Sequence, residues 1–529
     1  MNLSRFTEVD WGASPPEIRV PRAYNAAADF IDRHIAEGRG ERVAFIDDRE
    51  QVTYGELAER VNRAGNALKA LGLQPEDRIM MVMLDTIDFP ALFFGAIKAG
   101  IVPVPVNTLL TADDYAYMLR DSRARAVFVS DALYPVIEGA LEDQPFVRDV
   151  VVSGEAAGGR PRLADLMARA DADLAPAETL ADETCFWLYS SGSTGRPKGA
   201  VHIHSDMVNT AVLYGQQILG LSQNDTVFSA AKLFFAYGLG NAMTFPLYVG
   251  GKAVLMAERP TPESVLKRLN DHNPTVFYAV PTLYAGMLAD PALKPGREDA
   301  DLRLCVSAGE ALPRDVGERW RQRFGVDIID GIGSTEMLHI FLSNRPGEVR
   351  YGTTGKPVPG YEAKLTTEDG QAVPQGEIGD LWISGPSSAV AYWNNRARSL
   401  ETFHGPWTRT GDKYLIDENG CYVYQGRSDD MLKVGGIWVS PFEVESALGE
   451  HEAVLEAAVV GRADHDGLVK PEAFVTLAEG RTGDDALAGE LQAFVKDRLA
   501  KYKYPRWINF VDELPKTATG KTQRFKLRD

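Results

Sequence analysis

The sequence predicts an α/β protein with a large N-terminal domain of mostly parallel, helix-covered sheets, a β-rich subdomain, and a small α+β domain at the C-terminal end. The chain has 529 residues, more than one domain usually holds. Short apolar strand signals alternate with amphipathic helix signals up to about residue 330, a pattern typical of helix-covered parallel sheets. Beyond about residue 350, glycine, proline and aspartate interrupt shorter strand signals. We expect domains at residues 1–428 and 429–529.

The alternation begins with an apolar strand signal at residues 43–47. Thr53 and Glu56 follow with the spacing of a capping box, which marks the start of a helix. The apolar face of this helix is formed by Leu57, Val61, Ala64 and Leu68. Residues 78–83 are the next strand signal, and residues 89–99 are the next helix signal. Strand, helix and strand in succession favour parallel pairing.

Residues 352–426 carry the β-rich pattern, and the polar stretch RSDDMLK that follows is a candidate hinge. Ser440 and Glu443 then have capping-box spacing, with Pro441 at the first helical position. The remaining signals, at residues 454–460, 473–477 and 491–500, form two strands and a helix. Together they indicate a small α+β unit.

The composition is that of a globular protein, with 45% hydrophobic and 25% charged residues. A formal net charge of −18 argues against a nucleic-acid partner, because such proteins need a basic surface. The three cysteines lie far apart without CxxC spacing, which disfavours a disulfide framework or a cysteine-based zinc site. The uncharged window at residues 233–251 contains Asn241, Pro246 and several glycines, which favours buried loop and helix over a membrane span. The N-terminal residues lack a signal-peptide core, so we expect a cytoplasmic protein with no membrane partner.

The strongest local feature is a loop rich in glycine and hydroxyl residues after the strand signal at residues 185–189. Glycine lets backbone N–H groups approach an anion, hydroxyls add donors, and cations neutralise charge. We therefore expect a phosphate-binding loop made of Ser190, Ser191, Gly192, Ser193, Thr194, Gly195 and the catalytic Lys198. The alternative is a flexible, solvent-exposed loop. It is not a Walker loop, because the one GK[ST] match, at residues 520–522, has Pro515 where that motif requires its first glycine.

Six ordered stretches resemble the superfamily of adenylate-forming enzymes, which includes acyl-CoA synthetases, peptide-synthetase adenylation domains and luciferases. They are SSGSTGRPKG (190–199), GIGSTE (331–336), TGD (410–412), YQGRSDD (424–430), KVGG (433–436) and PKTATGK (515–521). The resemblance covers essentially the whole chain. It implies that a carboxylate reacts with ATP to give an acyl-adenylate and pyrophosphate.

The resemblance also implies roles for individual residues. Glu336 matches the Mg²⁺-ligating glutamate, Thr335 the donor to the α-phosphate, and Lys521 the lysine that bridges the substrate carboxylate and the α-phosphate. Asp412 matches the acceptor of the ribose hydroxyls, and Arg427 the arginine near the ribose. Further nucleotide contacts are implied for Gly309, Glu310, Asp330, Gly331 and Ile332. Cations and oriented donors suit this reaction because both reactants are anions. Taken singly, each residue has an ordinary alternative, such as a helix cap, a turn aspartate or a solvated cation.

A second step must capture the acyl-adenylate before it hydrolyses. The resemblance implies that the C-terminal domain is a mobile lid that rotates about Asp429 and withdraws Lys521. The face then presented to the thiol of coenzyme A contains Lys433, Gly435, Gly436 and Trp438. Glycines suit a narrow thiol tunnel. A basic cluster, made of Lys496, Arg498, Lys501, Lys503 and Arg506, either meets the phosphates of coenzyme A or is a solvated helix end.

Aromatic residues and glycine gather in three stretches, residues 232–240, 307–312 and 332–344, which suits a flat ring in a tight apolar slot. These stretches resemble the benzoate–CoA ligases of bacterial aromatic catabolism. The resemblance implies that benzoate is activated as the first step of its degradation. The implied ring wall is Ala236, Tyr237, Gly333, His339 and Ile340, with Tyr237 and His339 deciding which ring substituents fit. Simple core packing is the alternative for both.

Other functions are left open by the sequence. The aryl-adenylate could be transferred to a carrier-protein thiol, or oxidised as in luciferases, and the acid could be 4-hydroxybenzoate or 2-aminobenzoate. His202 and His204 lie two apart, but no third ligand is evident, so we do not expect a zinc site. We expect ATP, Mg²⁺ and an aromatic carboxylate to bind, coenzyme A to act as co-substrate, and the protein to be a monomer or homodimer.

Overall fold

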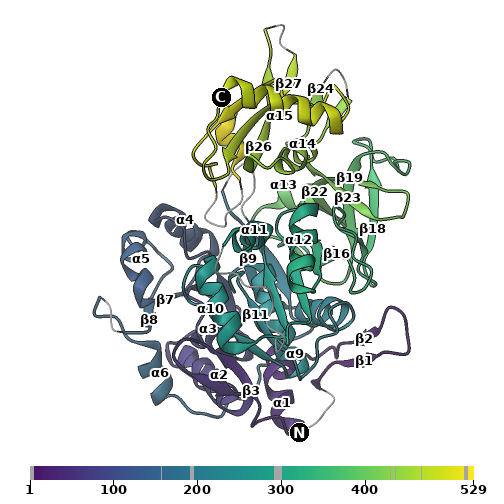
Figure 1. The fold of residues 1–529 in the computed structure, drawn as a ribbon. Coiled ribbons are helices and arrows are strands. Elements are labelled where there is room, and N and C mark those ends of the chain that lie inside the picture. The colour runs from purple at the N-terminus through teal and green to yellow at the C-terminus, as the bar shows by residue number, and fades with distance from the viewer. Residues whose placement is uncertain are drawn as a thin grey trace.

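The computed structural model describes residues 5–155, 158–190, 196–290, 301–428, 430–434, 437–465, 468–516 and 522–528. Figure 1 shows the C-terminal elements, drawn in yellow, grouped at one end of the molecule and the N-terminus at the opposite end. A large α/β body, a β-rich part and a small C-terminal α+β part follow one another along the chain, which confirms the predicted fold class.

Two mostly parallel sheets form the large body. The first has four parallel strands in the order β6-β5-β7-β8, with bounds Val102–Pro105, Arg78–Val82, Ala126–Ser130 and Asp149–Ser153. The second has nine strands in the order β17-β16-β15-β14-β13-β11-β12-β3-β4. Their bounds are Lys356–Pro357, Ile340–Ser343, Ile328–Gly333, Leu304–Ser307, Val276–Ala279, Thr226–Ser229, Lys252–Val254, Val43–Ile46 and Gln51–Thr53. The strands from β15 to β3 pair in parallel, and the edge strands pair antiparallel.

Helices connect many of these strands and bury apolar side chains against the sheets. They include α2 (Tyr54–Ala70), α3 (Asp88–Lys98), α4 (Ala112–Ser122), α5 (Tyr134–Ala140), α6 (Leu163–Arg169), α10 (Pro262–His272), α11 (Pro281–Ala289) and α12 (Arg314–Phe324). The predicted capping box of Thr53 and Glu56 is present at the start of α2, and the four predicted apolar-face residues are buried. An N-terminal hairpin, β1 (Glu8–Asp10) and β2 (Glu17–Arg19), and helix α1 (Arg33–Ala36) precede this body.

Two antiparallel sheets complete the part that precedes the predicted hinge. Strands β9 (Thr184–Ser190), β10 (Lys198–Ile203) and β20 (Ala391–Tyr392) form one, in the order β20-β10-β9. The β-rich part has the order β18-β19-β22-β21, with β23 paired to β22. Its bounds are Glu362–Thr366, Gly379–Ser384, Trp407–Ile416, Phe403–His404 and Tyr422–Arg427, and α13 (Arg396–Thr402) lies beside it. The β9–β10 pair is antiparallel because the loop between them is too short for a crossover helix.

The C-terminal part has its own apolar core, which includes Val439, Leu448, Val459 and Val475. Its elements are β24 (Leu432–Val434), β25 (Ile437–Val439), α14 (Pro441–Gly449), β26 (Val454–Ala463), β27 (Val469–Leu477), α15 (Asp485–Arg498) and β28 (Trp507–Phe510). The capping box predicted for Ser440 and Glu443 is only half formed. The Ser440 hydroxyl accepts from the Glu443 N–H at 3.1 Å, but the Glu443 carboxylate binds Lys503 Nζ at 2.6 and 2.7 Å instead of returning to the cap.

The uncharged window at residues 233–251 folds as two short helices, α8 (Ala236–Leu239) and α9 (Phe245–Val249), joined by a π-helical turn, Gly240–Thr244. Most of its residues are buried, as predicted. Among the described helices, none is both long and apolar enough to cross a membrane.

Candidate active site

A tight turn, residues 334–339, joins β15 to β16 and carries predicted site residues of two kinds. Thr335 and Glu336 lie at its start, and His339 and Ile340 lie at its end. The Leu338 N–H donates to the Thr335 carbonyl at 3.2 Å, and Leu338 adopts a positive φ of 65°, which is costly for a branched residue. The predicted nucleotide-side and ring-side residues therefore share one short, strained segment.

The side chain of Glu336 is held by strand β20. The Tyr392 hydroxyl donates to Glu336 Oε1 at 2.7 Å, and the Ala389 N–H donates to the Glu336 backbone carbonyl at 2.7 Å. Lys198 Nζ lies 4.7 Å from the centroid of the Tyr392 ring. Burial lowers the pKa of Lys198, and the Glu336 carboxylate opposes that shift. The structure thus brings Lys198 and Glu336 together across Tyr392.

Asp412 and Arg427 face each other on strands β22 and β23. Arg427 Nη1 donates to Asp412 Oδ1 and to the Thr410 carbonyl, each at 3.0 Å. The Asp412 carboxylate raises the pKa of Arg427, and Glu336 acts in the same direction. Asp412 and Arg427, each predicted from sequence to lie near a ribose, are therefore brought together, and Arg427 lies within electrostatic range of Glu336.

The other predicted nucleotide residues lie at the ends of two neighbouring parallel strands. Gly309 and Glu310 follow β14, and Gly309 needs its positive φ of 91°. Asp330, Gly331 and Ile332 lie within β15. Burial raises the pKa of Asp330 well above its ordinary value. Among the described residues, Asp330 Oδ1 has no hydrogen-bond partner, so this buried oxygen is able to accept from a ligand.

An aromatic wall surrounds His339. The centroid of its ring lies 4.5 Å from that of Phe245, 5.4 Å from that of Tyr214 and 5.7 Å from that of Tyr237. A Cβ at Gly240 would lie 2.3 Å from His339 Cδ2, so that position must be glycine for the ring to stay where it is. This wall contains the predicted Tyr237 and His339, and it is tightly packed.

The polar atoms of this wall are largely tied to protein groups. The Tyr237 hydroxyl donates to the Val306 carbonyl at 3.0 Å. His339 Nε2 lies 3.1 Å from Asn241 Oδ1 and 3.3 Å from the Tyr237 carbonyl, so it must carry the proton. Burial lowers the pKa of His339 to about 3, which leaves the imidazole neutral. Ala236 is partly buried at the start of α8.

Close packing also explains two predicted glycines, Gly333 of the ring site and Gly331 of the nucleotide site. A Cβ at Gly333 would lie 2.5 Å from the His339 carbonyl oxygen, and one at Gly331 would lie 2.9 Å from Ile340 Cγ2. Ile340 is fully buried between these strands. Gly333, His339 and Ile340 are therefore brought together, as the sequence predicted.

Several predicted residues lie outside the described part of the chain. They are Ser191, Gly192, Ser193, Thr194 and Gly195 of the phosphate loop, the hinge residue Asp429, the tunnel glycines Gly435 and Gly436, and Lys521. Ser190 ends β9. Lys433 and Trp438 lie opposite each other on β24 and β25, and their side chains are not described.

Two further sequence features are partly explained. In the basic cluster, Lys503 pairs with Glu443 and Arg498 with Glu450, while Lys496 and Arg506 both pack on the Tyr504 ring. His202 and His204 each bind protein groups. In the described ranges, no group of three or more acidic, histidine or cysteine side chains is placed to hold a metal ion.

Sequence reasoning missed Tyr392, Tyr214 and Phe245. None of them lies in a recognisable motif, and each reaches the site only through tertiary packing.

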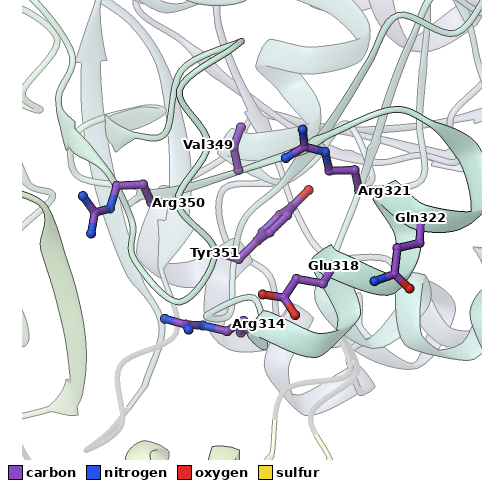
Figure 2. Close-up of a pocket in the computed structure, with 7 residues that line it drawn as sticks. All are labelled: Arg314, Glu318, Arg321, Gln322, Val349, Arg350 and Tyr351. Carbon is purple, nitrogen blue, oxygen red and sulfur yellow. The ribbon is translucent and has the colours of Figure 1, made fainter.

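A surface cavity of about 380 Å³ lies elsewhere, between helix α12 and the loop after β16. Figure 2 shows the side chains that line it, with Tyr351 among them. It is lined by Arg314, Glu318, Arg321, Gln322, Val349, Arg350 and Tyr351. The Tyr351 hydroxyl is already bonded to Asp327 Oδ1 at 3.0 Å. No residue predicted for nucleotide or acid binding lines this cavity.

Comparison with known proteins places the chain among relatives of similar length. The sequence profile of the AMP-binding enzymes matches residues 32–393, and that of the AMP-binding enzyme C-terminal domain matches residues 443–521. The chain is 60% identical over 521 residues to a benzoate–CoA ligase of Thauera aromatica, covering 98% of each chain. It is 54% identical to a 4-hydroxybenzoate–CoA/benzoate–CoA ligase of Rhodopseudomonas palustris, covering 96% of this chain and 94% of the other. Its fold matches the crystal structure of a benzoate CoA ligase from Burkholderia xenovorans with a TM-score of 0.90, 57% identity and coverage of 96% and 100%.

Proposed function

The chain belongs to the AMP-binding enzyme family, and from that premise we propose that it is an AMP-forming ligase that joins benzoate to coenzyme A through benzoyl-AMP. The alignment with the Thauera ligase runs over nearly the full length of both chains, so it spans both proposed domains and not one motif alone. The tight aromatic wall around His339 supports a flat ring over an alkyl chain.

The observation that carries this proposal is the turn between β15 and β16. It presents Glu336, beside Lys198 and Tyr392, on one side and His339 of the aromatic wall on the other. A carboxylate attached to an aromatic ring needs this combination, because its ring must be desolvated while its charged end meets a phosphate. Glu336 and His339 are only three positions apart. In this proposal, one small acid therefore reaches both the charged side and the aromatic side of the turn.

In the proposed adenylation step, a benzoate oxygen attacks the α-phosphorus of ATP, and the bond from that phosphorus to the pyrophosphate oxygen breaks. Negative charge concentrates on the α-phosphate oxygens in the transition state, so preorganised cations and donors lower the barrier. We assign the cationic roles to Lys198 and Lys521 and the donor role to the Thr335 hydroxyl. Asp412 would accept from the ribose hydroxyls, with Arg427 holding its carboxylate.

Glu336 fits the role of a Mg²⁺ ligand. Mg²⁺ is usually held by one or two carboxylates together with water and nucleotide phosphates, so a dedicated cage of protein ligands is not required. The bond from Tyr392 to Oε1 fixes the direction of the Glu336 carboxylate. When bound, the ion would supply positive charge to the phosphates of ATP.

For the second step, we assign a mobile C-terminal domain with a boundary between residues 428 and 429 and a hinge at Asp429. The separate apolar core of the C-terminal part supports a unit that moves as a body. The sulfur of coenzyme A would attack the acyl carbon of benzoyl-AMP, AMP would leave, and the thiol would enter past Lys433, Gly435, Gly436 and Trp438.

The proposal extends to the setting of the enzyme. We assign a cytoplasmic location and a monomer or homodimer. The three cysteines are buried and unpaired, which suits a reducing compartment.

The test is formation of AMP and thioester from Mg-ATP, coenzyme A and each of five acids: benzoate, 2-aminobenzoate, 4-hydroxybenzoate, hexanoate and acetate. We expect benzoate to give equal amounts of AMP and benzoyl-CoA. The two aliphatic acids, hexanoate and acetate, should react slowly. AMP without thioester would instead favour transfer to a carrier-protein thiol. A faster reaction with a substituted benzoate would correct the identity of the acid.

A further inference from the structure

A fully buried histidine and aspartate lie directly behind the turn that holds Thr335 and Glu336. His202 Nδ1 lies 2.8 Å from Asp206 Oδ2, and His202 Nε2 lies 2.8 Å from the Thr335 carbonyl oxygen. Both side chains are 0% exposed. His202 is on β10, Asp206 starts helix α7 (Asp206–Thr210), and the two are joined through the bulged end of β10.

The partners of this histidine dictate which of its atoms carry protons. The Thr335 carbonyl oxygen is only an acceptor, so His202 Nε2 must donate. On the other side, Asp206 Oδ2 also accepts from the Ile203 N–H at 3.2 Å, and burial raises the pKa of Asp206. A protonated Asp206 donates to Nδ1 of a neutral His202, and an ionised Asp206 accepts from Nδ1 of an imidazolium. In both arrangements Nε2 carries the proton that binds the Thr335 carbonyl.

The ring is also fixed in orientation. It stacks on Phe186 of β9, with centroids 5.3 Å apart and an interplanar angle of 18°. A ring held by stacking on one face and bonded at both nitrogens cannot swing away from Thr335. The bond is thus a rigid link from strand β10, which also carries Lys198, to the turn.

The peptide that receives this bond has Thr335 on one side and Glu336 on the other. Its carbonyl also accepts from the Leu338 N–H at 3.2 Å, which closes a turn with a strained residue. On the far side, the turn is held through Glu336 by Ala389 and Tyr392. Without His202, the Thr335–Glu336 peptide would be held by the bond from the Leu338 N–H, by the contacts to Glu336, and less directly by the Ser334 and Ser387 hydroxyls, which bond to Met337.

We propose that His202 and Asp206 are positioning residues for adenylation, which set the plane of the Thr335–Glu336 peptide and so align the α-phosphate donor with the metal-ligating carboxylate. This inference rests on the proposed function. Neither residue touches the substrates. The alignment matters when the adenylyl group is transferred and not when the thiol captures the acyl group. Loss of His202 should therefore affect the two half-reactions differently.

The test compares His202→Phe, which keeps a stacked ring but removes both ring nitrogens, with His202→Gln, whose amide can still donate to Thr335. Adenylation is followed as pyrophosphate release from benzoate and Mg-ATP, and capture is followed as thioester formation from supplied benzoyl-AMP. We expect His202→Phe to lower the kcat of adenylation by about tenfold to a hundredfold, with the KM of benzoate nearly unchanged and capture within about twofold of wild type. We expect His202→Gln to recover most of the lost rate.

His204→Phe is the matched control, because His204 is an equally buried histidine whose Nδ1 accepts from the Ala26 N–H and not from the turn. It should slow both half-reactions by the same factor if it slows either. Equal loss of adenylation and capture in His202→Phe, or a His202→Gln variant that folds but is no faster than His202→Phe, would overturn the proposal. A wild-type protein that does not adenylate benzoate would instead reject the proposed function, which separates the two failures.

Discussion

A single hydroxyl group controls how Glu336 is presented to the site. The Tyr392 hydroxyl donates to its carboxylate at 2.7 Å, and burial raises the pKa of Tyr392, so the phenol stays protonated and able to donate. A hydrogen bond to a charged group contributes about 1.5–3 kcal/mol. Tyr392 thus acts on the proposed metal ligand without itself needing to touch the substrate.

We expect Tyr392→Phe to slow benzoate adenylation by about tenfold or more, because the Glu336 carboxylate loses its fixed direction. The Mg²⁺ concentration that gives half-maximal rate should rise, and the measurement is pyrophosphate release across a Mg²⁺ titration. Tyr115→Phe is the control, since Tyr115 donates at 2.7 Å to the Asn107 carbonyl, far along the chain from the turn. An unchanged Mg²⁺ requirement in Tyr392→Phe would remove the link between Tyr392 and Glu336.

A second single residue should make stability depend on pH. Asp85 is 3% exposed, and its carboxylate accepts from the Leu233 N–H at 3.2 and 3.3 Å. Burial raises its pKa to about 6, against the opposing charge of Lys232. The folded state therefore holds a proton that the unfolded chain releases near pH 4, so the contribution of Asp85 to stability is lost as the pH rises through about 6.

We expect Asp85→Asn to gain stability relative to wild type as the pH is raised from 4.5 to 8, by about 2 kcal/mol, because asparagine cannot ionise and can still accept from Leu233. Urea unfolding of both proteins at the two pH values measures the difference. If the free energy of unfolding differs between the two proteins by the same amount at both pH values, Asp85 does not titrate in this range.

At the scale of an element, the π-helical turn Gly240–Thr244 sets the position of the aromatic wall. Gly240 has ordinary helical backbone angles, so alanine is tolerated there by the backbone. The added Cβ would nevertheless lie 2.3 Å from His339 Cδ2 and 3.0 Å from Phe245 Cζ. The ring of His339 must then move.

We expect Gly240→Ala to raise the KM of benzoate by about tenfold and to leave the KM of ATP within about twofold, because a displaced ring costs contacts on the acid side only. Steady-state kinetics with each substrate varied will separate the two. Gly489→Ala in α15, where a Cβ meets nothing within 4 Å, should leave both constants unchanged. Equal increases in both constants for Gly240→Ala would mean that the turn supports the whole fold and not the ring wall.

The elements also show what sequence can predict. The helix after Thr53 and the apolar strands were predictable because capping and hydrophobic spacing are local properties. The predicted residues Glu336, Asp412 and Arg427 lie near one another as expected, because ordered motifs carried them. Tyr392 and the Thr335 contact of His202 were not predictable, since both are made between residues distant in the chain. The half-formed capping box at Ser440 has the same cause: Lys503 competes for Glu443 from another element.

At the scale of the whole molecule, the proposed domain motion would let two reactions use opposite faces of one small domain. We expect Lys521→Ala to lower benzoate adenylation by about a hundredfold or more, because the charge opposite the transition state is lost, and to leave thioester formation from supplied benzoyl-AMP nearly intact. Pyrophosphate release and thioester formation, measured separately, test this. Loss of both to the same extent would contradict the role assigned to Lys521.

The complementary variant is Gly436→Leu. A side chain at that position should obstruct the proposed thiol path, so thioester formation from benzoyl-AMP should fall by about tenfold or more, whereas pyrophosphate release should stay within about twofold of wild type.

The two variants also test the assigned domain motion when they are mixed. If benzoyl-AMP leaves one molecule and enters another, Gly436→Leu can supply the adenylate that Lys521→Ala captures, and the mixture will make benzoyl-CoA faster than either alone. If the adenylate stays bound through the rotation, as a mobile lid about Asp429 requires, the mixture will be no faster than the sum of its parts. A normal thioester rate in Gly436→Leu would reject the tunnel, while a large gain on mixing would show that the intermediate escapes between steps.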